Sequence, residues 1–94
     1  MELTELQGVI RRTYVARDRS RGVDATFRWF TEEVGELARA IRKGDRRNLE
    51  LEFSDVLAWL VSLANLMEVD LETVVGRYAA SCPKCGASPC TCPL

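Results

Sequence analysis

Residues 24–67 read DATFRWFTEEVGELARAIRKGDRRNLELEFSDVLAWLVSLANLM, and the apolar side chains of this stretch decide the fold. In its first half they recur at alternating three- and four-residue steps, so they share one face of a helix. These residues are Phe27, Phe30, Val34, Leu37 and Ile41. Arg42 and Lys43 suit the negative end of a helix dipole, and Gly44 suits the left-handed conformation that ends many helices. The pattern predicts that this helix ends at Gly44.

A second helix is expected to follow almost at once. Residues 45–48 form a short polar connection, which folds the second helix back antiparallel on the first. Apolar residues cover well over half of its circumference, as expected of a helix that is buried on two sides. They are Leu49, Phe53, Val56, Leu57, Trp59, Leu60, Leu63, Ala64, Leu66 and Met67. Because a chain of 94 residues has little else to cover this helix, we expect a homodimer or a dimer of dimers.

Further helices are predicted on either side of this hairpin. Thr4 and Gln7 have the spacing of a capping box, so a helix is expected to open there and to run to about residue 19. Asp24 is the expected N-cap of the hairpin's first helix, and Asp70 that of a last short helix. The predicted fold class is all-α: an antiparallel helical hairpin with flanking helices, similar to a four-helix bundle, assembled as an oligomer and followed by a short cysteine knuckle.

Length and composition predict one small globular domain over residues 1–81 and a separate cysteine-rich tail over residues 82–94. A formal net charge of −1 gives the molecule no general attraction to nucleic acid or to a membrane surface. The longest apolar run, residues 56–67, is shorter than the roughly 20 residues that cross a bilayer. Glu2 and Glu5 stand where a signal peptide would be apolar, so we expect a cytoplasmic protein.

Acidic residues form two pairs that mirror each other across the expected turn. Glu33 and Glu36 are three residues apart on the first helix, and Glu52 and Asp55 are three apart on the second. Residues at this spacing lie on nearly the same face of a helix. Glu36 and Glu52 are equidistant from Gly44, and so are Glu33 and Asp55. An antiparallel hairpin is therefore expected to bring all four carboxylates together.

Such a cluster predicts a site for a hard divalent cation. A lone pair of glutamates on a helix is usually solvated surface. Two matched pairs beside the core favour a shared ligand, because like charges this close repel one another without it. Ligands that are all oxygen suit Mg²⁺ or Mn²⁺. A ferritin-like di-iron site and a serine or cysteine nucleophile with a histidine base are both disfavoured, since the chain contains no histidine.

The run EEVGEL (residues 32–37), followed by EFSDVL (residues 52–57), resembles the E-E-x-x-E and E-x-x-D motifs of the MazG-type all-α nucleotide pyrophosphohydrolases. The resemblance covers roughly residues 24–80. It implies a house-cleaning hydrolase that uses magnesium to convert an NTP or dNTP into the monophosphate and pyrophosphate. By the same resemblance, the metal ligands and catalytic residues are Glu33, Glu36, Glu52 and Asp55.

Aromatic residues flank the expected site. Many members of this family have a basic residue one turn before the first motif glutamate, where this chain has Trp29 next to Arg28. Trp29 lies on the flank of Glu33, and Trp59 on the flank of Asp55, so either indole could stack on a nucleobase. Core or interface packing is an equally good interpretation of both tryptophans. Trp29, Trp59 and Arg28 are the candidate substrate-binding residues.

The tail contains all four cysteines, in the order C-x2-C-x4-C-x-C. Its first half, CPKCG (residues 82–86), is typical of a zinc knuckle, and four thiolates form a closed shell that suits a structural ion. We expect one zinc, bound by Cys82, Cys85, Cys90 and Cys92. The alternatives are a reduced flexible tail or disulfides. A redox C-x-x-C is disfavoured, because no thioredoxin-like pattern surrounds it.

Two other functions are compatible with the sequence. The tail and the arginine-rich first helix could bind nucleic acid or a protein, although acidic residues interrupt the arginines and the tail contains only one basic residue, Lys84. The chain could also be an inactive scaffold related to the MazG proteins. The carboxylates would repel a nucleic acid backbone unless a metal were present, so we favour hydrolysis of a nucleotide.

Overall fold

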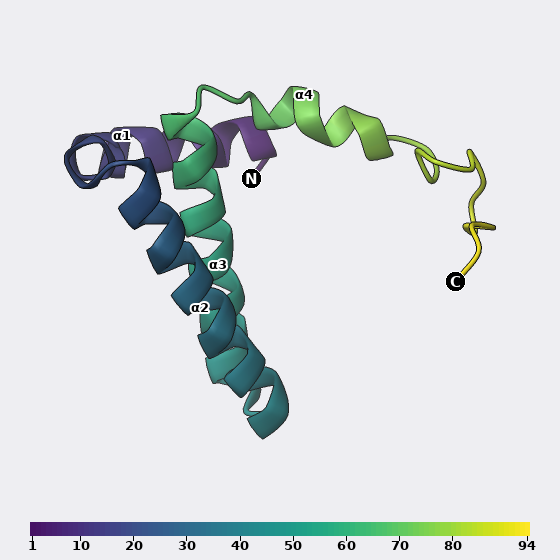
Figure 1. The fold of residues 1–94 in the computed structure, drawn as a ribbon, viewed down its shortest axis with the longest axis horizontal. Helices are drawn as coiled ribbons and strands as arrows, with labels where there is room; N and C mark the ends of the chain where they lie inside the picture. Colours follow the sequence, from purple (N-terminus) through teal and green to yellow (C-terminus); the bar gives the residue numbers. More distant parts are fainter.

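A computed structural model describes all 94 residues, and its regular structure is entirely helical (Figure 1). Its elements, in chain order, are α1 (Leu3–Arg21), α2 (Val23–Lys43), α3 (Arg46–Leu66), α4 (Leu71–Val75) and a short 3₁₀ helix, η1 (Gly76–Tyr78). The predicted all-α class, with a helical hairpin and flanking helices, is confirmed.

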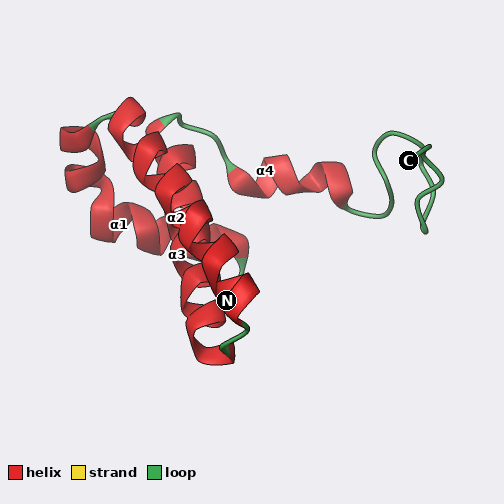
Figure 2. Ribbon diagram, turned by 60° about the horizontal axis from the view of Figure 1, so that its bottom comes forward, coloured by secondary structure: helices red, strands yellow, loops and turns green.

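The hairpin of α2 and α3 turns at Gly44 and Asp45. Gly44 has a φ of 74°, and its N–H donates to the Ala40 carbonyl at 2.9 Å, so α2 ends as predicted. The Asp45 carboxylate accepts from the backbone N–H groups of Arg47 at 3.1 Å and Asn48 at 3.5 Å. This N-cap starts α3 earlier than the sequence pattern predicted. The two helices run antiparallel and side by side (Figure 1, Figure 2).

α1 lies across the end of the hairpin that is opposite this turn (Figure 1). Only Gly22 separates α1 from α2, and its φ of 88° lies in the range that favours glycine. Gly22 occupies the N-cap position of α2 and Asp24 lies in the first turn, so the predicted Asp24 cap is wrong. The buried apolar core of the chain is small and consists of Ile10, Ala40, Val61 and Ala64.

Gln7 is a buried link between α1 and the turn before α4. Its Nε2 donates to the Val69 carbonyl at 2.7 Å, and its Oε1 accepts from the Leu71 N–H at 3.0 Å. Thr4 lies inside α1 and does not cap it, so the predicted capping box is wrong. Asp70 does cap α4 as predicted, and accepts from a backbone N–H of its first turn at 3.1 Å.

One side of the hairpin exposes an apolar surface. α3 buries one flank, where Val61 is fully covered, but its other apolar flank is open. We refer to this open surface as the apolar face; its residues are Phe27, Val34 and Ile41 on α2 and Phe53, Leu57 and Leu60 on α3. Their exposed fractions range from 42% for Val34 to 59% for Ile41. The expected burial of α3 on two sides is therefore not reached within one chain.

Beyond α4 the chain leaves the helical body. α4 contacts α1, whereas the residues after η1 project away from the hairpin in both views (Figure 1, Figure 2). None of the helices combines the length and the apolar character that a membrane span requires.

Candidate metal centres

Three carboxylates converge between α2 and α3. Oxygens of Glu33, Glu36 and Glu52 all lie within 4.8 Å of one another, and the three side chains are half-buried. Glu33 and Glu36 are on adjacent turns of α2, and the antiparallel hairpin places Glu52 of α3 beside them. The structure thus brings together three of the four carboxylates that the spacing around Gly44 predicted.

Two of these carboxylates bury an oxygen that has no hydrogen-bond partner, namely Glu33 Oε2 and Glu52 Oε2. Burial raises the pKa of Glu33 from 4.5 to about 7, and the charges of Glu36, Asp55 and Glu52 add to this effect. Burial also raises the pKa of Glu52, together with the charges of Glu36 and Asp55. A bound cation would relieve both the unpaired oxygens and the mutual repulsion.

Asp55 lies slightly apart from this cluster. It is exposed, and it is not part of the group whose oxygens fall within 4.8 Å. Its charge still contributes to the raised pKa values of Glu33 and Glu52, so it is within electrostatic reach of both.

The donor atoms of the cluster fit a hard divalent cation. They are carboxylate oxygens only, and Mg²⁺ binds such oxygens while waters and substrate phosphates complete its shell. The unpaired oxygens of Glu33 and Glu52 are available as ligands. No sulfur or imidazole belongs to the cluster, which disfavours softer metals.

The two candidate tryptophans pack against each other. Trp29 and Trp59 stack with ring centroids 6.1 Å apart and an interplanar angle of 13°. The guanidinium carbon of Arg21 lies 4.8 Å from the Trp59 ring centroid, so Trp59 contacts both Trp29 and Arg21. Trp29 remains 48% exposed. Arg28 is exposed and forms no ion pair.

A cleft of about 200 Å³ opens next to Asp55, between α1 and α3. Its lining residues are Tyr14, Arg17, Asp18 and Arg21 from α1 and Asp55, Ala58, Trp59 and Ser62 from α3. The sequence reasoning did not identify the α1 residues as part of a site. A signal was present, because positions 14, 17 and 21 continue the helix face of the buried Ile10 with polar and cationic residues.

Residues 21–84 match the family model of the MazG nucleotide pyrophosphohydrolase domain. The chain belongs to this family. The matched residues include the hairpin and all four candidate carboxylates, which confirms the resemblance that the two acidic motifs indicated. Most of α1 precedes the MazG match, and Cys85 lies beyond it. No curated protein matches the chain.

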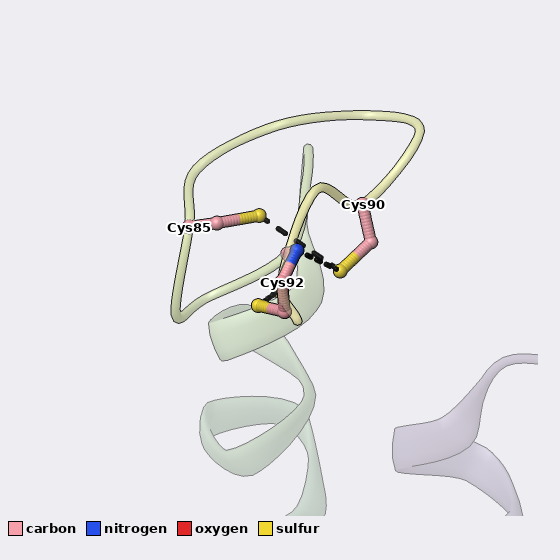
Figure 3. A group of neighbouring side chains, drawn as sticks. Cys85, Cys90 and Cys92 are labelled. Carbon is pink, nitrogen blue, oxygen red and sulfur yellow. Dashed lines mark hydrogen bonds between the residues drawn. The ribbon is translucent and has the colours of Figure 1, made fainter. Parts of the chain in front are cut away.

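At the end of the MazG match the tail gathers its four cysteines into a second cluster, of which Figure 3 shows Cys85, Cys90 and Cys92. The four Sγ atoms lie within 4.8 Å of one another. Cys82 Sγ and Cys92 Sγ are 3.7 Å apart, and Cys85 Sγ and Cys90 Sγ are 3.9 Å apart. No disulfide is formed. A Zn–S bond of about 2.3 Å gives a tetrahedral sulfur–sulfur edge of about 3.8 Å, so the cluster has the size of a tetrathiolate zinc shell.

The turn that carries Cys82 and Cys85 is closed by backbone hydrogen bonds. Cys82 N–H donates to the Ala87 carbonyl at 3.1 Å, and Gly86 N–H donates to the Cys82 carbonyl at 2.8 Å. Gly86 has a φ of 75°, which explains the glycine of the CPKCG run. The turn brings the Sγ atoms of Cys82 and Cys85 within 4.8 Å of each other.

Backbone N–H groups also donate to the sulfurs. Thr91 N–H donates to Cys85 Sγ at 3.4 Å. Cys92 N–H donates to Cys90 Sγ at 3.3 Å (Figure 3). Backbone donors, with Thr91 foremost, lower the pKa of Cys85 to about 5, and backbone donors also lower the pKa of Cys82. The neighbouring sulfurs, with Cys90 foremost, raise the pKa of Cys92 to about 11. The backbone donors favour the thiolate form of Cys82 and Cys85. All four cysteines can be thiolates together only if a cation offsets their mutual repulsion.

Proposed function

We propose that this protein is a magnesium-dependent nucleoside triphosphate pyrophosphohydrolase, which converts an NTP or dNTP and water into the monophosphate and pyrophosphate. One observation carries the proposal. Glu33, Glu36 and Glu52 converge on the hairpin that matches the family, and two of them bury carboxylate oxygens that have no partner.

In this proposal the metal ligands are Glu33, Glu36, Glu52 and Asp55, with Asp55 turning in from its exposed rotamer. When bound, Mg²⁺ or Mn²⁺ would neutralise phosphate charge and promote attack by water. The half-buried setting of the glutamates strengthens their hold on a cation, because charges interact more strongly away from bulk water. Phosphoryl transfer depends mainly on positioning and charge neutralisation, so no protein nucleophile is required.

For the nucleobase we propose a contact with the exposed side of Trp29. The ring is half-exposed, and its other side is supported by Trp59. A supported indole offers a rigid apolar surface to any base. In this proposal Trp59 supports the Trp29 ring rather than contacting the base itself. Arg28 remains a candidate for contacts with the substrate outside the carboxylate cluster.

We also propose that a second copy of the chain covers the apolar face, as a homodimer or a dimer of dimers. Soluble monomers rarely expose contiguous apolar patches of this kind, and twofold dimers are the commonest closed assemblies. Leu57 of the apolar face and Asp55 are about 160° apart around α3. Dimerisation through the apolar face would therefore leave the carboxylates open to substrate.

For residues 82–94 we propose one structural zinc, which makes this tail a unit separate from residues 1–81. The tail has few apolar side chains with which to order itself by burial. Structural zinc contributes on the order of 10 kcal/mol, which offsets a large part of that entropy. Free thiolate ligands persist in a reducing compartment, so we propose that the protein acts in the cytoplasm.

Pyrophosphate release over a panel of NTPs and dNTPs, with and without magnesium, tests the hydrolase. We expect Glu36→Gln to abolish release, because it removes a charged ligand. The matched control is Glu32→Gln, an exposed neighbour on α2 that lies outside the cluster. Wild-type turnover by Glu36→Gln would reject the site. Salt-sensitive RNA binding without hydrolysis would favour a binding module, and the absence of both would favour an inactive scaffold.

A further inference from the structure

One face of α1 changes character along the helix. Its successive positions are three or four residues apart and therefore line up on one side. At the start of α1 this face carries Gln7 and Ile10, which are buried. Further along it carries Tyr14, Arg17 and Arg21, which line the cleft against α3. A helix face that meets the rest of a small fold is usually apolar, so this change to aromatic and cationic side chains points to a ligand.

Arg21 is fixed in the wall of the cleft. Its Nη1 donates to Asp18 Oδ1 at 3.0 Å and to Thr26 Oγ1 at 3.3 Å, and its guanidinium lies over Trp59. Asp18 is only 3% exposed, so this ion pair is largely removed from water. Buried pairs hold their geometry because breaking them leaves an uncompensated charge. Arg21 therefore presents a positioned cation whose charge Asp18 partly balances.

Arg17 is the cation of the cleft that has no partner in the protein. It is exposed, and the ion pairs of the chain are Arg21–Asp18 and Arg46–Glu50. It lines the same cleft as Asp55, the outermost of the candidate metal ligands. A guanidinium offers a planar fork of donors that matches phosphate oxygens in pairs.

The size of the cleft suits part of a nucleotide. It measures about 200 Å³, whereas pockets that enclose a whole drug-sized ligand span roughly 300–1,000 Å³. A phosphate chain or a single ring fits such a space. The unpaired guanidinium of Arg17 favours the phosphate chain. It supplies positive charge, which a polyphosphate needs and the carboxylates do not provide.

We propose that Arg17, backed by the fixed Arg21, binds the polyphosphate chain of the substrate on the α1 side of the carboxylate cluster. This inference rests on the proposed hydrolase function. The carboxylates and a polyphosphate together carry more negative charge than one divalent cation balances, so a nearby arginine lowers the repulsion. Arg17 precedes the residues that match the family model, so the match itself assigns it no role.

Steady-state kinetics of Arg17→Ala test the inference, with Arg12→Ala as the matched control. Arg12 is also an exposed arginine of α1, but it lies outside the cleft. We expect Arg17→Ala to raise KM for the nucleotide, and the inhibition constant of magnesium pyrophosphate, by about tenfold with little change in kcat. Arg17→Lys should recover part of the affinity. Arg17→Ala should also weaken the dependence of KM on ionic strength, which loss of a structural contact would leave unchanged.

The outcomes separate this inference from the hydrolase. If Arg17→Ala and Arg12→Ala change KM equally, or if neither changes it, the phosphate contact is rejected. Hydrolysis by the wild type would still support the hydrolase proposal. If the wild type hydrolyses no nucleotide, the hydrolase proposal fails, and calorimetry with magnesium pyrophosphate still tests the cleft. Weaker binding by Arg17→Ala than by Arg12→Ala would then support the contact. No pyrophosphate binding by the wild type would overturn the phosphate contact as well.

Discussion

Glu33 on α2 and Glu52 on α3 face the same space between the arms of the hairpin, and each buries one carboxylate oxygen without a hydrogen-bond donor. Neither side chain has an arginine or lysine partner, because the ion pairs of the chain lie elsewhere. Helical hairpins do not need buried acids for folding, and each unpaired oxygen costs stability. The pair is therefore best explained by a ligand that binds between them.

The metal-free protein should lose stability as pH rises from about 5 to 8. The folded pKa of Glu33 is raised from 4.5 to about 7. Between these values the unfolded chain has released its proton while the folded protein keeps it, so the free energy of unfolding falls as pH increases. We expect a loss of about 2 kcal/mol, less than the full shift implies because the carboxyl is partly hydrated. Urea denaturation at each pH measures it.

Two comparisons check the assignment of this pH dependence to the carboxylate cluster. Glu33→Gln should flatten the stability profile, whereas the exposed neighbour Glu32→Gln should leave it unchanged. Magnesium should restore stability at pH 8 in the wild type, because the ion binds the ionised carboxylates of the folded state only. A profile in which stability rises steadily between pH 5 and 8 would contradict the prediction.

Asp55→Asn should abolish magnesium-dependent pyrophosphate release without unfolding the helices. The change removes one negative ligand, and magnesium affinity depends on ligand charge. It also removes a charge that repels Glu33 and Glu52, so the metal-free variant should melt slightly above the wild type. Glu50→Gln is the matched control, because Glu50 is exposed on the same helix and lies outside the cluster. Undiminished turnover by Asp55→Asn at limiting magnesium would show that Asp55 is not a ligand.

The hairpin could be predicted because its signals are local. Gly44 supplies the left-handed residue that ends α2, and the apolar periodicity of each arm predicts a helix on either side of it. The error at Thr4 has a physical cause. The partners of Gln7 are Val69 and Leu71, which are far away in sequence, so a local capping pattern could not reveal them.

The carboxylate part of the candidate site could be predicted from the same local signals as the hairpin. Equal spacing from Gly44 placed Glu36 beside Glu52, because residues equidistant from an antiparallel turn lie at similar heights, and the three-residue step on α2 placed Glu33 beside Glu36. The rotamer of Asp55 and the cleft beside it depend on how α1 packs across the end of the hairpin. That packing is set by tertiary contacts such as Arg21 over Trp59, and the helical spacing of Tyr14, Arg17 and Arg21 shows only that they share a face of α1, not what this face contacts.

Wild-type protein should be a dimer, or a dimer of dimers, at micromolar concentration. Leu57→Glu places a charge in the centre of the apolar face and should dissociate the assembly, because burying an unpaired charge at an interface is costly. Leu51→Glu is the matched control, since Leu51 is 56% exposed but lies about 120° around α3 from Leu57 and outside the apolar face. Light scattering distinguishes the species. A stable wild-type monomer would refute the assembly.

The tail should bind one zinc per chain, independently of the carboxylate chemistry. Soft thiolates select zinc and hard carboxylate oxygens select magnesium, so the two sites need not compete for ions. Elemental analysis of protein purified without chelator should find about one zinc per chain.

Replacing Cys85 and Cys90 with serine should remove this zinc and loosen the tail, since two of the four sulfurs of the shell are lost. The tail projects away from the hairpin (Figure 1), so the same variant should retain magnesium-dependent hydrolysis. Ser81→Ala, next to the cluster but without a ligand atom for zinc, should keep both the zinc and the melting temperature of the wild type. Wild-type protein without zinc, whose melting is unchanged by the cysteine replacements, would leave a metal-free tail as the better account.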